Sequence, residues 1–472
     1  MSVKQPTSDR QQPDKGSASS TEPPEPSAGS QSGSDVPPPL TARSGFWVIM
    51  GWAAVLGLCI ALAALVFLAL LKGGTDLWYT EPKNPGWFDG PVWWVAVTAG
   101  AGLLVGLLRR FFRLPVNQPG TIVEMKEGRV EPSTVLPSVV VSLVTLVGGA
   151  SLGPEAALGK MGGGLGTLVS ERLKLGERVR EANTLSGMAA AFGALLSAPY
   201  VAVVIILEVA RPKVGRLSDT LIATLLAATV GFAVYFPIAG STFVGLYRVP
   251  SFTYHDWQLA AAIPLGLLAA VLALVTAIAL GLMKKLTAPL TEHTILRSTI
   301  GGIVFGLVAV ALPLTLFTGT DQLKTVLQDG AVLGAGLLIA VVFAKILVFA
   351  LCPATGFIGG PFFPLVMVGG TAGVAVHDLI PGLPLALTFS AMLAALPGAL
   401  VAVPFGLLLL SILITQIGTL QSAPVAVAVL TAYLALSGTG TLMALINKGK
   451  QAASSDAQPP SQPAPSTAAT GA

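Results

Sequence analysis

The chain has 472 residues, of which 53% are hydrophobic and 11% are charged, and its formal net charge at pH 7 is +4. Soluble domains carry about 25% charged residues, so most of this chain must face lipid or other buried helices. Apolar runs of about 20 residues, the length that crosses a bilayer, recur without polar–apolar alternation, which argues against a β-barrel. Basic loops at the membrane surface explain the positive charge more simply than nucleic acid, since no basic stripe with interleaved aromatic residues is present.

The two ends of the chain differ in composition from everything between them. Residues 1–44 are rich in Ser, Pro, Gln and charged side chains, and residues 448–472 are mainly Ala, Ser, Pro and Gln. Neither segment can bury enough apolar surface to offset the entropy lost on ordering, so we expect two disordered tails. The first is too long and polar for a signal peptide, so Phe46–Leu71 should be an uncleaved membrane helix. No soluble regulatory domain is expected after the membrane part.

Between the tails, long apolar runs alternate with shorter pieces that are broken by Gly and Pro. The long runs are Thr220–Tyr247, Leu259–Met283 and Thr299–Thr320, and the broken pieces include LLSAPYVAVVIILEVARP (195–212) and GFIGGPFFPLVMVGGTAG (356–373). Broken and re-entrant helices are tolerated in a membrane only where their backbone is buried in protein or lines a cavity. The pattern is typical of a transporter or channel rather than a receptor-like bundle.

A glycine-rich break occurs in each half of the membrane region. One lies in segment 148–166, within residues 45–250, and the other in segment 345–373, within residues 251–447. Equivalent breaks in two halves point to an inverted repeat with a binding site between the halves. We therefore predict an all-α polytopic membrane protein, built from two membrane repeats with these bounds and containing many tilted, broken and re-entrant helices.

Two basic loops without acidic residues adjoin apolar runs and give the orientation. They contain Arg109, Arg110 and Arg113 in the first case, and Arg211, Lys213 and Arg216 in the second. Since basic loops stay on the cytoplasmic side, we expect both loops, and the N-terminus, to be cytoplasmic in a multi-pass protein of the plasma membrane.

Cysteine and histidine give no sign of a metal site. Cys59 and Cys352 lie in apolar stretches and are interpreted as small buried hydrophobic residues, and the three histidines occur singly. The apolar runs also lack a His-Glu metal motif and the Ser/Lys or Asp/Asp pairs of intramembrane hydrolysis. We expect neither a metal nor a cofactor, and no enzymatic activity.

Glu155 is a single carboxylate inside the glycine-rich stretch GGASLGPEAALGKMGGGLG (148–166). Pro154 is a good first helical residue, and an acid in the first turn is stabilised by the helix dipole, so an ordinary helix start is one interpretation. In a membrane segment, however, an ionisable residue is costly and is a functional candidate. A helix N-terminus is also an anion site, which a carboxylate and a mobile anion could occupy in turn. Glu155 would then act as a gate.

Three segments resemble the CLC chloride channel and transporter family. The first, residues 152–163, is similar to the family's G-R-E-G-P…I-G-G segment, with matches at Gly153, Glu155, Gly162 and Gly163. The second, residues 345–373, resembles the family's basic-residue helix at Lys345, followed by G-x-F-x-P at Gly360, Phe362 and Pro364. The third, residues 195–210, resembles N-A-P followed by an apolar run and two acids, with matches at Ala198, Pro199 and Glu208. The three occur in family order and span most of the membrane region.

The resemblance implies an anion path between helix N-termini near the middle of the bilayer. Glu155 would be the outer gate, and Phe362 would line the central site. The implied anion site comprises Gly153, Pro154, Glu155 and Ala156 from the first segment and Gly360, Pro361, Phe362 and Phe363 from the second. Chloride would be the permeant ligand.

Departures from the family pattern bear on the mechanism. Val209 stands where proton-coupled members carry the inner proton-transfer glutamate, so the relay of an anion/proton exchanger is lost there. Glu208, the retained acid, is interpreted as a helix-end or ion-pair carboxylate, and Lys345 as a snorkelling or internally paired lysine.

Two polar side chains of the family's inner site are also missing. If NQPGTIVE (117–124) aligns with the family's first signature, Gly120 replaces the serine that contacts the anion, and Met443 or a neighbour replaces the closing tyrosine. Pro154 and Pro361 remove two backbone donors. Fewer donors mean weaker coordination, which favours passage over tight coupling.

These features predict a passive anion channel with Glu155 as its protonatable gate. An anion/proton exchanger with a different relay, and a membrane relative that transports nothing, are the alternatives. The partners expected are the lipid bilayer, a small inorganic anion and a second copy of the chain in a homodimer, and not nucleic acid.

Overall fold

The computed structural model describes residues 45–79, 86, 88–115, 120–240 and 243–456, with side chains as far as residue 438. Both predicted tails therefore lie mainly outside the described residues. The last helix continues to Asp456, beyond residue 448 where the C-terminal tail was predicted to begin. The side chain of Met443, the predicted replacement for the closing tyrosine, lies outside the described part of the chain.

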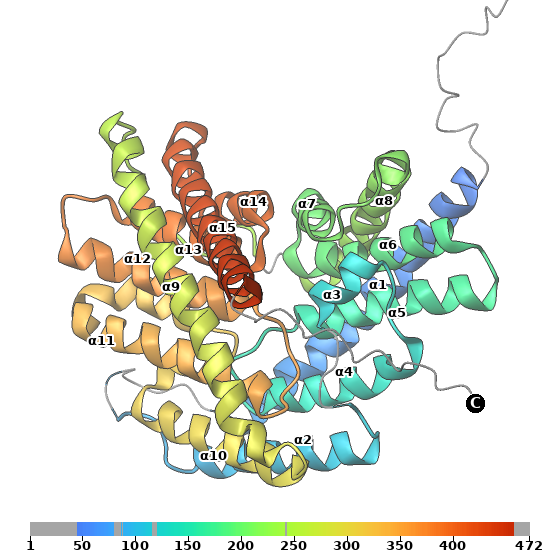
Figure 1. Ribbon diagram of the computed structural model, residues 1–472, viewed down its shortest axis with the longest axis horizontal. Coiled ribbons are helices and arrows are strands. Elements are labelled where there is room, and N and C mark those ends of the chain that lie inside the picture. The colour runs from blue at the N-terminus through green and yellow to red at the C-terminus, as the bar shows by residue number, and fades with distance from the viewer. Residues whose placement is uncertain (1–44, 80–85, 87, 116–119, 241–242, 457–472) are drawn as a thin grey trace, which may run out of the picture. The chain divides into compact units, whose positions relative to one another are not determined.

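The described residues are helical apart from turns and one isolated bridge (Figure 1). The first half forms α1 (Phe46–Trp78), α2 (Trp94–Phe111), α3 (Thr121–Glu127), α4 (Pro132–Val147), α5 (Glu155–Arg172), α6 (Glu177–Leu196), α7 (Pro199–Ala210) and α8 (Val214–Ala239). The second half forms α9 (Trp257–Thr287), α10 (Thr294–Ala311), α11 (Thr320–Ala354), α12 (Phe362–Leu379), α13 (Leu385–Val401), α14 (Pro404–Thr415) and α15 (Thr419–Asp456). Two 3₁₀ turns, η2 (Ala288–Leu290) and η3 (Pro313–Thr315), precede α10 and α11.

Among the described residues, eight helices are long and apolar enough to cross a membrane, which agrees with the prediction of a polytopic helical membrane protein. Two of the apolar runs predicted from the sequence extend beyond the end of the helix that contains them. Helix α8 ends at Ala239, because Gly240 takes a positive φ of 74° and turns the chain out of the helix. Helix α10 ends at Ala311, because the proline two residues later cannot continue it.

Many helices are broken, as the Gly and Pro pattern predicts. Helix α11 is interrupted at Gly334, whose φ of 75° and ψ of 151° are not helical. Prolines lie inside several other helices, at Pro137, Pro237, Pro264, Pro397 and Pro424. Such breaks leave backbone groups without intrahelical partners, so they must be satisfied by neighbouring helices or line a cavity.

One face of α1 is an exposed apolar surface in the part of the chain that the structure describes. Leu58, Leu62 and Val66 are 46%, 47% and 61% exposed, while Ile49 and Ala53 on the other face are buried. Cys59 is exposed on this outer face, so the prediction that both cysteines are buried is wrong for Cys59 and correct for Cys352. An apolar side chain that faces lipid looks the same in sequence as one that faces the core.

Two pairs of helices show that the halves of the chain repeat the same local structure. Helix α5 begins six residues after Gly149 (φ 84°), and α12 begins six residues after Gly356 (φ 97°). Both helices have 18 residues and a proline as N-cap.

Helices α7 and α14 form the second pair. Each has 12 residues and begins with a proline. A residue in the left-handed conformation stands two positions before each helix, and another directly follows its last residue. The left-handed residues are Ser197 and Arg211 around α7, and Ala402 and Gln416 around α14. Non-glycine residues seldom adopt this conformation, so its recurrence at equivalent places is a property of the repeat.

The isolated bridge joins equivalent residues of the two halves. The N–H of Gly153 donates to the carbonyl of Gly360 at 2.9 Å, and the N–H of Gly360 donates to the carbonyl of Gly153 at 2.7 Å. A reciprocal antiparallel pair between equivalent residues is what a two-fold relation between two repeats produces. The two glycine-rich breaks therefore meet at the middle of the repeat arrangement.

Candidate functional site

Glu155 is the first residue of α5, and its side chain is buried. Pro154 is the N-cap, with φ −73° and ψ −14°, and its carbonyl accepts the first helical hydrogen bond from the N–H of Leu158 at 3.0 Å. Residue 155 is 3% exposed. A carboxylate so deeply buried needs donors close by, because its charged form has lost its water.

The donor comes from the equivalent turn of the other half. The N–H of Phe362, the first residue of α12, donates to Oε1 of Glu155 at 2.7 Å. Pro361 is the N-cap of α12, and the first helical bond of α12 runs from Leu365 to the Pro361 carbonyl at 3.3 Å. The N–H groups of Phe362 and Phe363 thus have no acceptor within their own helix. The side chain of one repeat occupies the helix N-terminus of the other.

The glycines beside this contact make room for the carboxylate. A Cβ at Gly153 would lie 1.9 Å from Oε2 of Glu155, and a Cβ at Gly360 would lie 2.2 Å from its Cδ. The N–H groups of Gly153 and Gly360, both predicted members of the anion site, donate to each other's carbonyls and therefore do not face an anion. The donor that faces Glu155 is the N–H of Phe362, the residue that follows Pro361.

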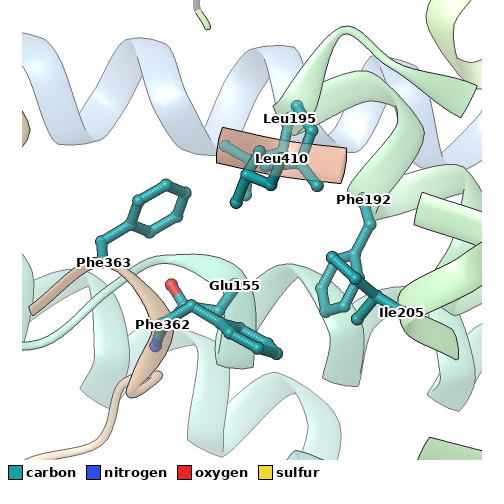
Figure 2. A pocket seen from close by; sticks show the side chains of 8 residues that line it. Glu155, Phe192, Leu195, Ile205, Phe362, Phe363 and Leu410 are labelled. Carbon is teal, nitrogen blue, oxygen red and sulfur yellow. Dashed lines mark hydrogen bonds between the residues drawn. The ribbon is translucent and has the colours of Figure 1, made fainter. Parts of the chain in front are cut away.

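Apolar side chains pack on one side of Glu155. Figure 2 shows the aromatic rings of Phe192, Phe362 and Phe363 around it, together with aliphatic side chains of α6, α7 and α14. The aliphatic residues are Leu195, Leu196, Ile205 and Leu410. The space they enclose is about 10 Å³, which is barely enough for one water molecule.

Val209 lies one turn beyond Ile205 on α7 and is 3% exposed. It belongs to the same buried apolar cluster as Ile205, Leu196 and Leu410. Position 209 therefore offers a proton no acid, and the apolar space beside Glu155 has no room for a chain of waters.

A larger cavity, whose mainly apolar wall carries a few polar and charged groups, lies on another side of Glu155. Its volume is about 300 Å³, and it is lined by residues of α2, α3, α4, α5, α6, α11, α12 and the segment before α12. The predicted site residues Gly120, Ala156, Gly360, Pro361 and Phe362 all contribute to its wall. Thr121, next to Gly120, donates its hydroxyl to the carbonyl of Ala156 at 3.3 Å, which links α3 to the first turn of α5.

Two basic side chains in the wall of this cavity were not assigned a role from the sequence. Arg109 is 4% exposed and donates Nη1 to the carbonyl of Gly356 at 3.0 Å and Nη2 to that of Pro115 at 2.8 Å. Lys160 is 5% exposed and forms an ion pair with Glu124, whose Oε1 lies 3.0 Å from Nζ. Arg109 was interpreted as part of a basic surface loop, since an arginine that ends a helix cannot be placed inside or outside by composition alone.

Two other predicted residues lie away from this contact. Glu208 accepts the N–H groups of Phe405 at 3.0 Å and Gly406 at 2.6 Å, so it caps the start of α14 from the end of α7. Lys345 is fully buried, and its Nζ donates to the carbonyls of Thr315, Leu316 and Phe317 at 2.9, 3.1 and 2.7 Å. Neither side chain lines the cavity or the apolar space beside Glu155.

Tyr79 and Phe317 position the segment before Glu155. The hydroxyl of Tyr79 donates to the carbonyl of Gly148 at 2.8 Å, and its ring packs edge-on against Phe317 with the centroids 4.8 Å apart. The N–H of Phe317 donates to the carbonyl of Gly149 at 3.0 Å. Since Lys345 binds the carbonyl of Phe317, the buried lysine of the second half braces the glycine-rich break of the first half.

The arrangement places a carboxylate at the N-terminus of a helix from the other half of the chain. Helix N-termini bind anions through unpaired N–H groups and the helix dipole. The site thus contains a buried acid, backbone donors at the start of α12 and a cavity beside them.

Comparison with known families agrees with this arrangement. The family model described as voltage gated chloride channel matches residues 101–437, well over half of the chain. The chain therefore belongs to the voltage-gated chloride channel family, also called CLC, whose members are channels or transporters in membranes.

Curated relatives and solved structures match over nearly the same range. YfeO of Escherichia fergusonii, whose name gives ion transport as a provisional role, is 28% identical over 412 residues, covering 84% of this chain and 95% of that protein. The crystal structure of a slow cyanobacterial Cl⁻/H⁺ antiporter aligns with a TM-score of 0.71 at 20% identity, over 83% of this chain and 95% of the other. A CLC-type fluoride/proton antiporter aligns with a TM-score of 0.67 at 19% identity, over 82% and 95%. At these identities the structures show the shared fold.

Proposed function

We propose that this protein is a passive anion channel of the CLC type, which conducts chloride across the plasma membrane and is closed by the carboxylate of Glu155. The observation that supports the proposal most directly is the 2.7 Å hydrogen bond from the N–H of Phe362 to Glu155. The carboxylate occupies the place where the N–H groups of α12 would bind an anion. Opening requires that it leave, and protonation makes it leave more readily because the neutral acid binds a helix N-terminus less strongly.

Two features favour passage over proton exchange. The apolar space beside Glu155 holds about 10 Å³, and Val209 cannot carry a proton. The backbone around the site also offers fewer donors than its length suggests, since Pro154 and Pro361 have no N–H and Gly153 and Gly360 donate theirs to each other. A site with few donors binds an anion weakly and releases it quickly.

The antiporters among the structural neighbours make exchange the second candidate. An exchanger would need a proton path other than the one that Val209 interrupts. We place the N-terminus in the cytoplasm and the functional unit in a homodimer, in which apolar faces such as those near Thr220–Val234 and Leu407–Leu420 would meet; both remain predictions from the sequence.

The test is anion efflux from liposomes that contain the purified full-length protein, with chloride and external pH recorded together. A channel should release chloride after the membrane potential is collapsed, and should not drive protons uphill when a chloride gradient is imposed. Proton uptake coupled to chloride efflux would show that the protein is an exchanger and not a channel. Absence of flux for chloride, bromide, fluoride and nitrate would identify a relative that does not transport these anions.

A further inference from the structure

A buried ion pair beside this larger cavity is not explained by the gate. Lys160 and Glu124 have side-chain exposures of 7% and 3%, and their charged atoms lie 3.0 Å apart. Lys160 belongs to α5, five residues after Glu155, and Glu124 belongs to the short helix α3. Lys160 lines the cavity of about 300 Å³ that Glu155 also lines, and Glu124 lies behind it.

Stability is a poor explanation for this pair. Removing two charges from water costs more than most ion pairs return, and apolar side chains of similar size usually stabilise a buried position as well or better. What the structure shows is that Glu124 holds the ammonium of Lys160 in place at the cavity wall, with Nζ 3.0 Å from its Oε1.

The ammonium group of Lys160 has donors left for a ligand. An ammonium has three N–H donors, and the described residues provide one partner for Lys160, the carboxylate of Glu124. Arg109, in the same wall, donates Nη1 and Nη2 to carbonyls, while its buried Nε has no partner among the described residues. The cavity wall thus offers two fixed positive charges beside the removable negative charge of Glu155.

We propose that Lys160, with Arg109, holds a small monovalent inorganic anion in this cavity next to the gate, and that Glu124 fixes the position of the Lys160 ammonium for this purpose. The inference rests on the proposed function, since it assigns a waiting position on the path that Glu155 closes. Lys160 would raise the concentration of anions at the gate, because a charge in a partly desolvated cavity acts more strongly than one in water. Removal of the Lys160 side chain should lower both the affinity of the cavity for anions and the rate at which anions pass the gate.

The decisive variant exchanges the two charges, Lys160→Glu together with Glu124→Lys. It retains the buried ion pair and the summed charge, but it puts a carboxylate at the cavity wall. We expect chloride efflux from liposomes to fall by at least about 10-fold, a change that corresponds to about 1.4 kcal/mol. The control is Lys126→Gln, which removes an exposed lysine of the same helix α3 and should leave efflux unchanged.

Bromide in crystals of the full-length protein gives a second measurement that does not depend on flux. Anomalous scattering should locate an ion in the cavity beside Nζ of Lys160, and the ion should be absent from Lys160→Met and present in Lys160→Arg. These single variants also serve if the exchanged pair fails to fold, as judged by its elution in size-exclusion chromatography.

The outcomes separate this inference from the proposed function. If the wild-type protein passes chloride and the exchanged pair passes it equally fast, the role of Lys160 is wrong and the channel stands. If bromide binds beside Lys160 in a protein that passes no anion, the cavity site stands and the channel is wrong. Bromide that is absent from the wild-type cavity, or that binds equally in Lys160→Met, would overturn the cavity site.

Discussion

The first turns of α5 and α12 have the same backbone and carry opposite parts of one contact. Each turn has a glycine in the reciprocal bridge, then a proline as N-cap, then the first helical residue. That residue is Glu155 in one repeat and Phe362 in the other, and both are buried, at 3% and 7% exposure. The difference of a single side chain makes one turn the acceptor and leaves the other as donor. A symmetric backbone thus yields an asymmetric contact.

The largest effect should come from removing the acceptor. In Glu155→Ala the donors of α12 have no carboxylate to bind, so the site is open to anions from the cavity at all times. A hydrogen bond to a charged group contributes about 1.5–3 kcal/mol, so chloride efflux should rise roughly 10- to 100-fold. Efflux from liposomes at several pH values measures this, and its pH dependence should flatten in Glu155→Gln as well. Wild-type rates and an unaltered pH response would exclude Glu155 as the gate.

Moving the carboxylate to the other turn tests the equivalence itself. In Glu155→Ala combined with Phe362→Glu, the two-fold relation places the new carboxylate near the N–H of residue 155. We expect this carboxylate to close the path again. Chloride efflux should then be roughly 10-fold lower than in Glu155→Ala alone, if a hydrogen bond of similar strength forms. The same double variant with Phe362→Gln, which has the shape but not the charge, should remain open. Equal efflux from the two double variants would show that the turns are not interchangeable.

Adding one carbon beside the carboxylate should have a smaller effect in the same direction. Gly153→Ala and Gly360→Ala would bring a Cβ to within 1.9 and 2.2 Å of Glu155 atoms, so the flexible side chain must swing away. Overpacking of this kind costs about 1–3 kcal/mol, and we expect efflux to rise by roughly 5-fold or more. Gly100→Ala is the matched control, because a Cβ there meets nothing within 4 Å. A rise in the control, or none in the two site variants, would contradict the proposed packing.

The comparison of the turns also shows what the sequence can and cannot predict. The contact between segments 148–166 and 345–373 follows from their positions in the two halves, and a buried acid at a helix start is visible in LGPEAA. The roles of Gly153 and Gly360 were misjudged, because glycine in sequence indicates close approach but not which group approaches. Here the close group is the Glu155 side chain, and the glycine N–H groups bind each other.

The basic side chains of the cavity were missed for a different reason. Lys160 stands in the quoted stretch 148–166, but its partner Glu124 lies in another element, and a sequence gives no distance between them. Arg109 at the end of a helix was assigned to the surface, as most arginines would be. The signal that could have found Lys160 is a lysine inside a glycine-rich membrane segment, where an unpaired charge is costly.

Restoring an acid at position 209 should not by itself restore proton coupling. Val209→Glu places a carboxylate on α7, but the apolar space that Leu196, Ile205 and Leu410 line beside Glu155 still holds only about 10 Å³. Protons need a chain of waters or side chains to cross such a gap, so we expect chloride efflux within about 2-fold of wild type, a free-energy change below about 0.5 kcal/mol, and no uphill proton movement. External pH recorded under a chloride gradient measures this. Coupled proton uptake in Val209→Glu would show that the apolar packing opens to water during transport.

The smallest effect on transport should come from Glu208, which belongs to the second pair of equivalent helices. Its carboxylate accepts the N–H groups of Phe405 and Gly406, and it fastens the end of α7 to the start of α14 in the manner of a helix cap. Replacing a cap residue costs about 1 kcal/mol, so Glu208→Gln should lower the unfolding temperature in detergent by a few degrees while chloride efflux stays at the wild-type rate. Glu155→Gln gives the opposite result, a large change in efflux, and so provides the control. If Glu208→Gln has wild-type stability but an altered pH dependence of efflux, Glu208 takes part in conduction and is not a purely structural residue.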